Sequence, residues 1–308
     1  MNDAFAAHSA AAEDTEDDQN PIGRGAAVYL FLSVDMDNST AFKGMDTRWP
    51  FVIHNFYEDV VREIRIVCPR FNVWKYIGDE VTFWRRIEPG DDLARLVADT
   101  HAALDRIRAN LDAIEDHHHV KTRNVLSAKA TIWAAAAEFV KRANLHRDLK
   151  TSYMHPNRII IDEHILGVTE REHAGQVRIY DFIGPDIDIG FRTSHFAHRG
   201  FLLVSAGLAH ALLGEAGAVS GRHMKIVSYE RLKGVWNDRP YPIVWYTDDW
   251  TDTAGKFYYD EGWTNPIVER VMRGAYDDVG AITSILEQTN RLDAVAAAQD
   301  LLRGSARG

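Results

Sequence analysis

The chain has 308 residues, of which 46% are hydrophobic and 26% charged, as in an ordinary globular protein. Its formal net charge of -10 argues against non-specific binding to nucleic acid or to an anionic membrane surface, because both favour clustered Lys and Arg. The single cysteine, Cys68, excludes an internal disulfide and a Cys-based zinc site, and it fits a reducing, cytoplasmic setting.

The N-terminal stretch is expected to have no fold of its own. Residues 1–20 are rich in Ala and acidic side chains, and they lack the basic start and the apolar block of a signal peptide. We therefore expect residues 1–24 to form a disordered tail. No apolar run in the chain approaches the roughly 20 residues of a membrane span, so no direct membrane association is expected.

A strand, a helix, a hairpin and a second helix are expected in the first part of the chain. Residues 26–34 form a continuous apolar run, which is typical of a strand buried on both faces. Apolar residues recur at helical spacing over 49–67 and over 93–114, and two short strand patterns flank the turn at Gly78 to Glu80. This order predicts an α+β fold, a ferredoxin-like or palm-type α/β sandwich with helices covering a mostly antiparallel sheet.

The second part of the chain is less regular. Residues 125–140 fit either a strand or a helix, and residues 144–175 are interpreted as a connecting region or a small insertion. Further strands and helices are expected in the order strand 177–184, turn and helix 185–200, strand and helix 201–215, and hairpin 224–246. Residues 266–303 indicate one or two amphipathic helices outside the core. We expect one domain over 25–247 and a helical extension over 248–308.

Two carboxylates, Asp35 and Asp79, each lie at the end of an expected strand, where a sheet brings neighbouring side chains together. Taken singly, each is better interpreted as a turn or cap residue. As a pair they need a neutralising cation, and oxygen donors at strand ends suit Mg²⁺ or Mn²⁺. Backbone N–H groups at the helix start that follows are candidates to hold phosphates, namely those of Asn38, Ser39, Thr40 and Phe42. The pattern indicates a metal and triphosphate site.

A second group of polar residues follows the expected strand near residue 180. Asp181 ends that strand, and Asp188 and Arg192 lie four residues apart on the expected helix. One interpretation is an ion pair that stabilises the helix by a few tenths of a kcal/mol. The other is that Arg192 faces a cleft and stabilises the charge that builds on a transferring phosphoryl group.

Four segments resemble the best-known motif regions of class III nucleotidyl cyclases. In chain order they are "LSVDMDNSTAF", "KYIGDEVTF", "YDFIGPDIDIGFR" and "LKGVWNDRPYPIVWY", within residues 26–246. The resemblance implies that Asp35, Asp79 and the backbone carbonyl of Met36 bind two divalent ions, Mn²⁺ or Mg²⁺. These ions activate the ribose 3′-hydroxyl for attack on the α-phosphate, and pyrophosphate leaves.

The resemblance also implies a base-binding half-site. Lys75 and Asp181 match the pair that reads the base, Arg192 matches the arginine that stabilises the transition state, and Lys233 is a candidate phosphate ligand. Position 188 departs from the family pattern, because it is Asp where the family generally has an Asn that orients the ribose. Because the two half-sites come from different subunits in that family, the resemblance implies a head-to-tail homodimer.

The segments look closest to the stand-alone pyrimidine cyclases of bacterial anti-phage (Pycsar) systems. This implies conversion of UTP to cyclic UMP, with a separate cyclic-nucleotide-binding effector that reads the product. CTP and ATP are the alternative substrates. "KYIGDEVTF" also resembles the hairpin of diguanylate cyclases, although Ile77 replaces their first glycine, and an inactive nucleotide-binding regulator is a further alternative.

Three side chains near these motifs carry separate expectations. Trp133 and Tyr180 are core residues or, alternatively, narrow the base pocket. Glu80 is expected to be a solvent-facing residue of the hairpin turn.

Overall fold

The structure is a computed structural model, which describes part of the chain. That part comprises residues 26–88, 90–140, 157–161, 180–253, 266–289 and 291. The expected tail over 1–24 and most of the expected connecting region lie outside it. Within it, no helix is long and apolar enough to cross a membrane.

The first half of the fold has the β-α-β-β-α-β order of a ferredoxin-like unit. Its elements are β1 (Ala26–Asp37), α2 (Ser39–Met45), α3 (Trp49–Val67), β2 (Asn72–Ile77), β3 (Glu80–Arg86), α4 (Leu93–His118) and β4 (Ser127–Val140). Strand β1 is central and antiparallel to both β3 and β4, which gives the order β4-β1-β3-β2. The predicted α+β sandwich is confirmed, and residues 127–140 are a strand throughout.

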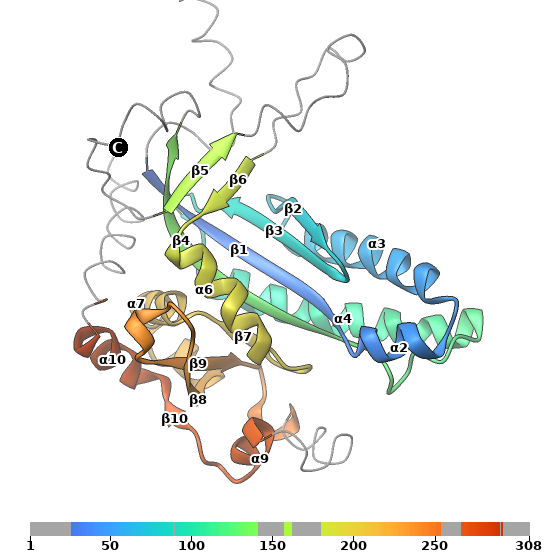
Figure 1. Ribbon diagram of the computed structural model, residues 1–308. Helices are drawn as coiled ribbons and strands as arrows, with labels where there is room; N and C mark the ends of the chain where they lie inside the picture. The colour runs from blue at the N-terminus through green and yellow to red at the C-terminus, as the bar shows by residue number, and fades with distance from the viewer. Residues whose placement is uncertain are drawn as a thin grey trace, which may run out of the picture.

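The second half extends the same sheet. Its elements are β5 (Asn157–Ile161), β6 (Tyr180–Ile183), α6 (Pro185–Thr193), the 3-10 turn η2 (Ser194–Phe196), β7 (Leu202–Val204), α7 (Ala206–His223), β8 (Met224–Arg231), η3 (Trp236–Asp238) and β9 (Pro240–Tyr246). Strands β7, β9 and β8 continue the sheet beyond β4, and β5 pairs with the end of β4 and with β6. Helices α3 and α4 lie along one face of the sheet, and α6 crosses the other (Figure 1).

The two faces of β1 differ along its length. One face is apolar throughout and contributes Leu30 and Leu32 to the core beneath α3 and α4. The opposite face begins with Ala27 and continues with Tyr29 and Phe31, and all three belong to an aromatic cluster under α6. It ends with Ser33 and the carboxylates of the strand terminus. Strand β1 therefore carries buried aromatic packing at one end and polar groups at the other.

Trp133 belongs to this aromatic cluster. Its side chain is fully buried, and its ring stacks on Phe31 with centroids 5.4 Å apart. Tyr180 packs edge-on against Trp84 at the margin of the same cluster. Of the two expectations for these side chains, core packing is the one that the structure supports.

The described elements within residues 266–289 pack on the domain, which corrects the expectation that the helices of this segment lie outside the core. Its elements are α9 (Pro266–Met272), β10 (Asp277–Asp278), η5 (Val279–Ala281) and α10 (Ile282–Gln288), and β10 pairs with β8. Val279, Ile282 and Leu286 are buried in the main core, because they provide the apolar cover for α7 and β8 that the sheet alone leaves open.

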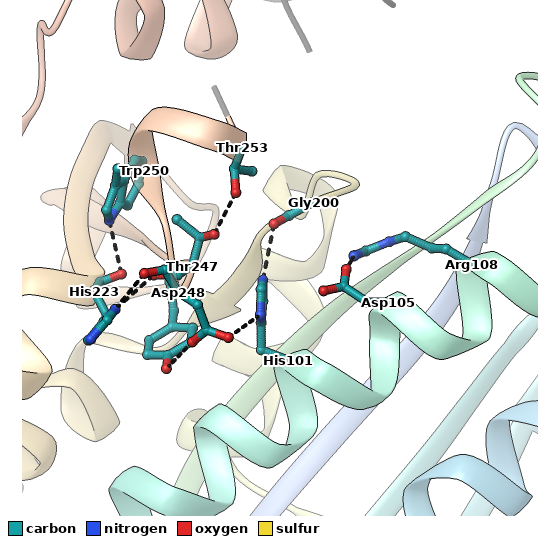
Figure 2. A network of polar contacts seen from close by, with 10 residues as sticks. His101, Asp105, Arg108, Gly200, His223, Thr247, Asp248, Trp250 and Thr253 are labelled. Carbon is teal, nitrogen blue, oxygen red and sulfur yellow. Dashed lines mark hydrogen bonds and ion pairs between the residues drawn. The ribbon is translucent and has the colours of Figure 1, made fainter. Parts of the chain in front are cut away.

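A polar network fixes the chain where it leaves β9. The buried imidazole of His101 on α4 lies 3.2 Å from the Gly200 carbonyl and 3.5 Å from a carboxylate oxygen of Asp248, and Tyr246 donates to the other oxygen at 2.8 Å (Figure 2). Trp250 donates to the His223 carbonyl at 3.1 Å. These contacts tie the segment to α4 and α7.

Candidate active site

The hairpin between β2 and β3 places Asp79 beside the end of β1. Gly78 has φ 66°, the left-handed value that a type II′ turn requires at its first central position, and Ile77 pairs with Glu80 across the turn. Met36 on β1 donates its N–H to the Asp79 carbonyl at 3.3 Å, and the Tyr57 hydroxyl on α3 donates to the Gly78 carbonyl. The position of Asp79 is therefore set by its backbone.

Three charged side chains form a row across the sheet at this end of β1. Asp35 is paired in register with Glu80 on β3 and with Lys129 on β4. The Lys129 ammonium lies 3.2 Å from an Asp35 carboxylate oxygen and 3.7 Å from one of Asp37. A pocket of ≈ 380 Å³ opens over this row, and its wall includes Asp79 and the start of α2. The structure thus brings the two predicted carboxylates to one pocket.

The local environment raises the proton affinity of two of these carboxyl groups. Burial raises the pKa of Asp35 from 3.8 to about 6, Lys129 opposes the increase, and the negative charge of Asp79 adds to it. Burial also raises the pKa of Glu80, whereas a hydrogen bond from Ser33 lowers it. A pocket that disfavours its own negative charge is one that a cation would stabilise.

Glu80 is therefore not the solvent-facing residue that the sequence suggested. It begins β3, is partly buried, lines the pocket and accepts a hydrogen bond from the Ser33 hydroxyl. The reason is register: the two-residue turn ends at Asp79, so Glu80 is the first strand residue and its side chain faces Asp35.

The donor set fits a divalent cation that shares its coordination with a substrate. In the part of the chain that the structure covers, no three His, Cys, Asp or Glu side chains form a group that could hold a metal ion by themselves. Asp35 and Asp79 supply two carboxylates, and because the Met36 side chain is buried in the core, only its backbone can serve the pocket. Mg²⁺ usually takes one or two carboxylates and completes its shell with water and phosphate oxygens.

Asp79 already has two partners on α2. It accepts a hydrogen bond from the Ser39 hydroxyl, and the Lys43 ammonium lies 3.1 Å from its other oxygen. Ser39 and Lys43 are four residues apart on α2, so one face of that helix addresses the carboxylate.

The start of α2 only partly matches the predicted phosphate contacts. Asn38 is in the left-handed conformation, with φ 63°, and its side chain donates to the Val125 carbonyl at 2.8 Å instead of capping the helix. Phe42 does not offer a free N–H, because that group donates to the Asn38 carbonyl at 3.2 Å, and its ring is buried. The N–H groups of Ser39 and Thr40, which line the pocket, belong to the first turn and have no intrahelical acceptor.

Lys75 and Asp181 form the second predicted pair. Lys75 on β2 and Asp181 on β6 are 106 positions apart in the sequence, and their ammonium and carboxylate lie 2.6 Å apart. The Lys75 ammonium also lies 4.8 Å above the Trp74 ring, and Asp181 accepts the Phe182 N–H at 3.0 Å. Both charged side chains remain about 40% exposed, at 41% and 40%, so a ligand can reach them.

Helix α6 carries Asp188 and Arg192, and both side chains are exposed. Within the described residues, Asp188 and Arg192 form no ion pair with each other. The position of the helix depends on Asn157, a fully buried side chain that the sequence did not single out. Its amide donates to the Ala136 carbonyl and to the Asp186 carboxylate, both at 2.8 Å, and its oxygen accepts the Asp186 N–H at 3.0 Å.

Lys233 is exposed in the turn after β8 and is not brought to the pocket. In the sheet order, β9, β7 and β4 separate β8 from β1. Its predicted contact with phosphate therefore has no support within one chain.

Sequence reasoning also missed Lys43 and Lys129. The spacing of Lys43 from Ser39 was a usable signal, since residues four apart share a helix face. Lys129 could be found only from the pairing of β4 with β1, which no local pattern specifies.

No family model matches the chain, and no curated protein matches it. Solved structures with a partial likeness include the adenylyl cyclase CyaB from P. aeruginosa, with a TM-score of 0.48 and 11% identity over 73% of this chain and 95% of that one. The guanylyl cyclase Cya2 has a TM-score of 0.43 and 13% identity over 72% and 91% of the two chains. An adenylate cyclase from Trypanosoma brucei has a TM-score of 0.45 and 14% identity over 74% of this chain and 91% of that one. Similarities of this size carry no inference about the activity of this chain.

Proposed function

We propose that the chain is a nucleotidyl cyclase that converts a nucleoside triphosphate into its 3′,5′-cyclic monophosphate and pyrophosphate. The observation that carries the proposal is the meeting of Asp35 and Asp79 on one pocket, beside the first turn of α2. Asp35 lies on β1 and Asp79 in the turn between β2 and β3, and their carboxylates can neutralise a divalent ion only because the sheet register and the hairpin turn bring them together.

The pocket residues have separate roles in this proposal. Asp35, Asp79 and the Met36 backbone carbonyl hold Mg²⁺ or Mn²⁺, whose chemistry is to lower the pKa of the 3′-hydroxyl and to neutralise the triphosphate. The N–H groups of Ser39 and Thr40 donate to phosphate oxygens. The 3′-oxygen forms its bond to the α-phosphorus in line with the bond to the leaving pyrophosphate, and its proton passes to solvent.

The second half-site supplies base recognition and charge stabilisation. Lys75 donates to a base acceptor, Asp181 accepts from a base donor, and Arg192 stabilises negative charge on the transferring phosphoryl group. Asp188 accepts a hydrogen bond from a ribose hydroxyl, whereas an asparagine at this position could also donate one.

We infer that the two half-sites come together in a head-to-tail homodimer, so that each site uses Asp35 and Asp79 of one chain and Lys75 and Arg192 of the other. Exposed apolar side chains beside both half-sites support this arrangement, since Ile77 on the pocket wall is 46% exposed and Ile183, two residues after Asp181, is 45% exposed.

UTP is the proposed substrate, and CTP and ATP are the alternatives. Every nucleobase presents a neighbouring donor and acceptor on its Watson–Crick edge, so the Lys75–Asp181 pair can bind each of them. The preference for UTP therefore rests on the resemblance to pyrimidine cyclases. The same resemblance supports a role in anti-phage defence, with cyclic UMP as a second messenger for a separate effector.

The decisive assay incubates the purified protein with ATP, GTP, CTP and UTP separately, each with Mn²⁺, and identifies products by mass spectrometry. Cyclic UMP with equimolar pyrophosphate is the expected product. A cyclic purine would refute the pyrimidine assignment, and a cyclic dinucleotide would indicate diguanylate cyclase chemistry. Nucleotide binding without pyrophosphate release would indicate an inactive regulator.

The shared-site dimer predicts complementation between two inactive variants. Asp35→Asn and Lys75→Ala each disable a different half-site, so a randomly mixed population should recover about a quarter of wild-type activity through one intact site per heterodimer. A mixture as inactive as its components, although native mass spectrometry shows heterodimers, would refute shared sites.

A further inference from the structure

Two lysines that the proposed function leaves without a role are paired with the two candidate metal ligands. The Lys129 ammonium lies 3.2 Å from an Asp35 oxygen, and the Lys43 ammonium lies 3.1 Å from an Asp79 oxygen. The side chain of Lys129 is 22% exposed and that of Lys43 is 31% exposed. Each carboxylate thus has its own monovalent counterion at the point where a divalent ion would bind.

The charges explain why the lysines lie there. The pocket wall includes three carboxylic side chains, those of Asp35, Asp79 and Glu80, but a single cationic one, that of Lys129. Close carboxylates repel one another, and an ammonium a few ångströms away offsets that repulsion while no metal is bound. A divalent ion competes for the same oxygens with twice the charge, so the ammonium groups must give way when it binds.

The displaced ammonium groups remain tethered beside the pocket. Lys129 is anchored by β4, where the neighbouring Ala128 and Ala130 are buried, and Lys43 lies on α2 one turn after Ser39. Both have four-carbon stems that can turn the charge from the carboxylate toward a neighbouring anion. A triphosphate bound at the metal presents such an anion, and lysine binds phosphate as a mobile point charge.

We propose that Lys43 and Lys129 are exchangeable counterions, which pair with Asp79 and Asp35 in the metal-free protein and bind phosphate oxygens once a divalent ion occupies the carboxylates. The identity of the anion as a triphosphate rests on the proposed function. The exchange itself rests on the two observed ion pairs. It predicts that removing a lysine charge changes the affinity for metal and the affinity for phosphate in opposite directions.

The test uses Lys129→Met, which keeps the apolar stem and removes the charge. Mn²⁺ binding is measured by electron paramagnetic resonance without nucleotide, and binding of inorganic tripolyphosphate is measured by calorimetry in saturating Mn²⁺. We expect Mn²⁺ to bind several-fold more tightly, because its competitor is gone. We expect tripolyphosphate to bind about tenfold more weakly, because a charge-assisted contact is lost. Lys43→Met should shift both affinities in the same directions.

Two further variants serve as controls. Lys129→Arg should keep tripolyphosphate binding within a few-fold, since the positive charge remains. Lys225→Met removes the same charge from β8, on the far side of β9, β7 and β4, and should change neither affinity. Thermal melting of every variant separates a binding effect from a folding defect.

The outcomes separate this inference from the proposed function. Mn²⁺ affinity that falls or stays constant in a folded Lys129→Met protein would overturn the exchange, and so would unchanged tripolyphosphate affinity. Wild-type protein that binds neither ion would overturn it as well. Opposite shifts in a protein that cyclises no nucleotide would support the exchange and reject the cyclase.

Discussion

Replacement of Gly190 by alanine should destabilise the protein, because α6 lies directly on the aromatic face of the sheet. A Cβ atom at position 190 would lie 2.1 Å from Cε2 and 2.2 Å from Cδ2 of Trp133. Non-bonded carbon atoms prefer separations of about 3.5–4.0 Å, so either the helix or the indole ring must move by more than about 1 Å. The ring is fully buried, stacked on Phe31 and flanked by Phe191, which leaves helix movement as the easier response.

The expected cost follows from this overlap. Adding a methyl group to a close-packed interior typically costs about 1–3 kcal/mol, and the absence of space at Trp133 favours the upper half of that range. Arg192 lies two residues further along the same helix, so its guanidinium should move with α6. A displacement of about 1 Å at a catalytic group can lower the rate roughly 100-fold.

Urea unfolding, monitored by tryptophan fluorescence and far-UV circular dichroism, measures the free energy of unfolding. The matched control is Gly44→Ala on α2, where a Cβ atom would meet nothing within 4 Å. This change should be neutral or should stabilise by about 0.5–1 kcal/mol, as alanine does in helices. Equal stability of Gly190→Ala and wild type, or an equal loss in the Gly44→Ala control, would refute the packing argument.

Three further predictions concern the two half-sites. Asp79→Asn should lower cyclase activity at least about 100-fold while the circular dichroism spectrum is unchanged, because the turn is held by backbone contacts; full activity would exclude a metal role for this carboxylate. Asn157→Ala should cost about 1–3 kcal/mol in urea unfolding, because it leaves the buried Ala136 carbonyl without its amide donor, and a neutral result would contradict the anchoring of α6. Asp35 has a higher pKa in the folded protein than in the unfolded chain, so the folded state binds more protons between pH 3.8 and about 6. The stability of the metal-free protein should therefore decrease as pH rises through this window, and Asp35→Asn should lack this component; a wild-type protein that gains stability there relative to the variant would contradict the assignment.

Local pattern predicted the elements of the first half well. The helix expected over 49–67 is α3, and the apolar run over 26–34 is a strand buried on both faces, because periodicity and burial are both properties of neighbouring residues. The hairpin at Gly78 followed from turn chemistry of the same local kind. The pairing of Lys75 with Asp181 was implied by the family resemblance, and the structure brings these two side chains together.

Long-range register accounts for what the sequence did not predict. Lys129 faces Asp35 only because β4 pairs with β1 in one particular register, and a shift of one residue would place Ala128 or Ala130 there. Glu80 was wrongly predicted to belong to the turn. The turn consists of Gly78 and Asp79 only, so Glu80 is already the first residue of β3. The packing of α10 on the main core depends on its contact with α7, and these two helices lie far apart in the sequence, so no local pattern predicts it.

The backbone contacts at the hairpin turn separate the frame of the pocket from its charge. Tyr57 and Met36 both hold the turn through main-chain carbonyls, so the loop keeps its place whatever side chain residue 79 bears. The carboxylate at position 79 can consequently be substituted without moving the turn. Substituting a neutral or a softer metal-ligating side chain at this position would test alternative cation preferences on an unchanged scaffold, which makes this pocket a suitable starting point for redesign of its metal specificity.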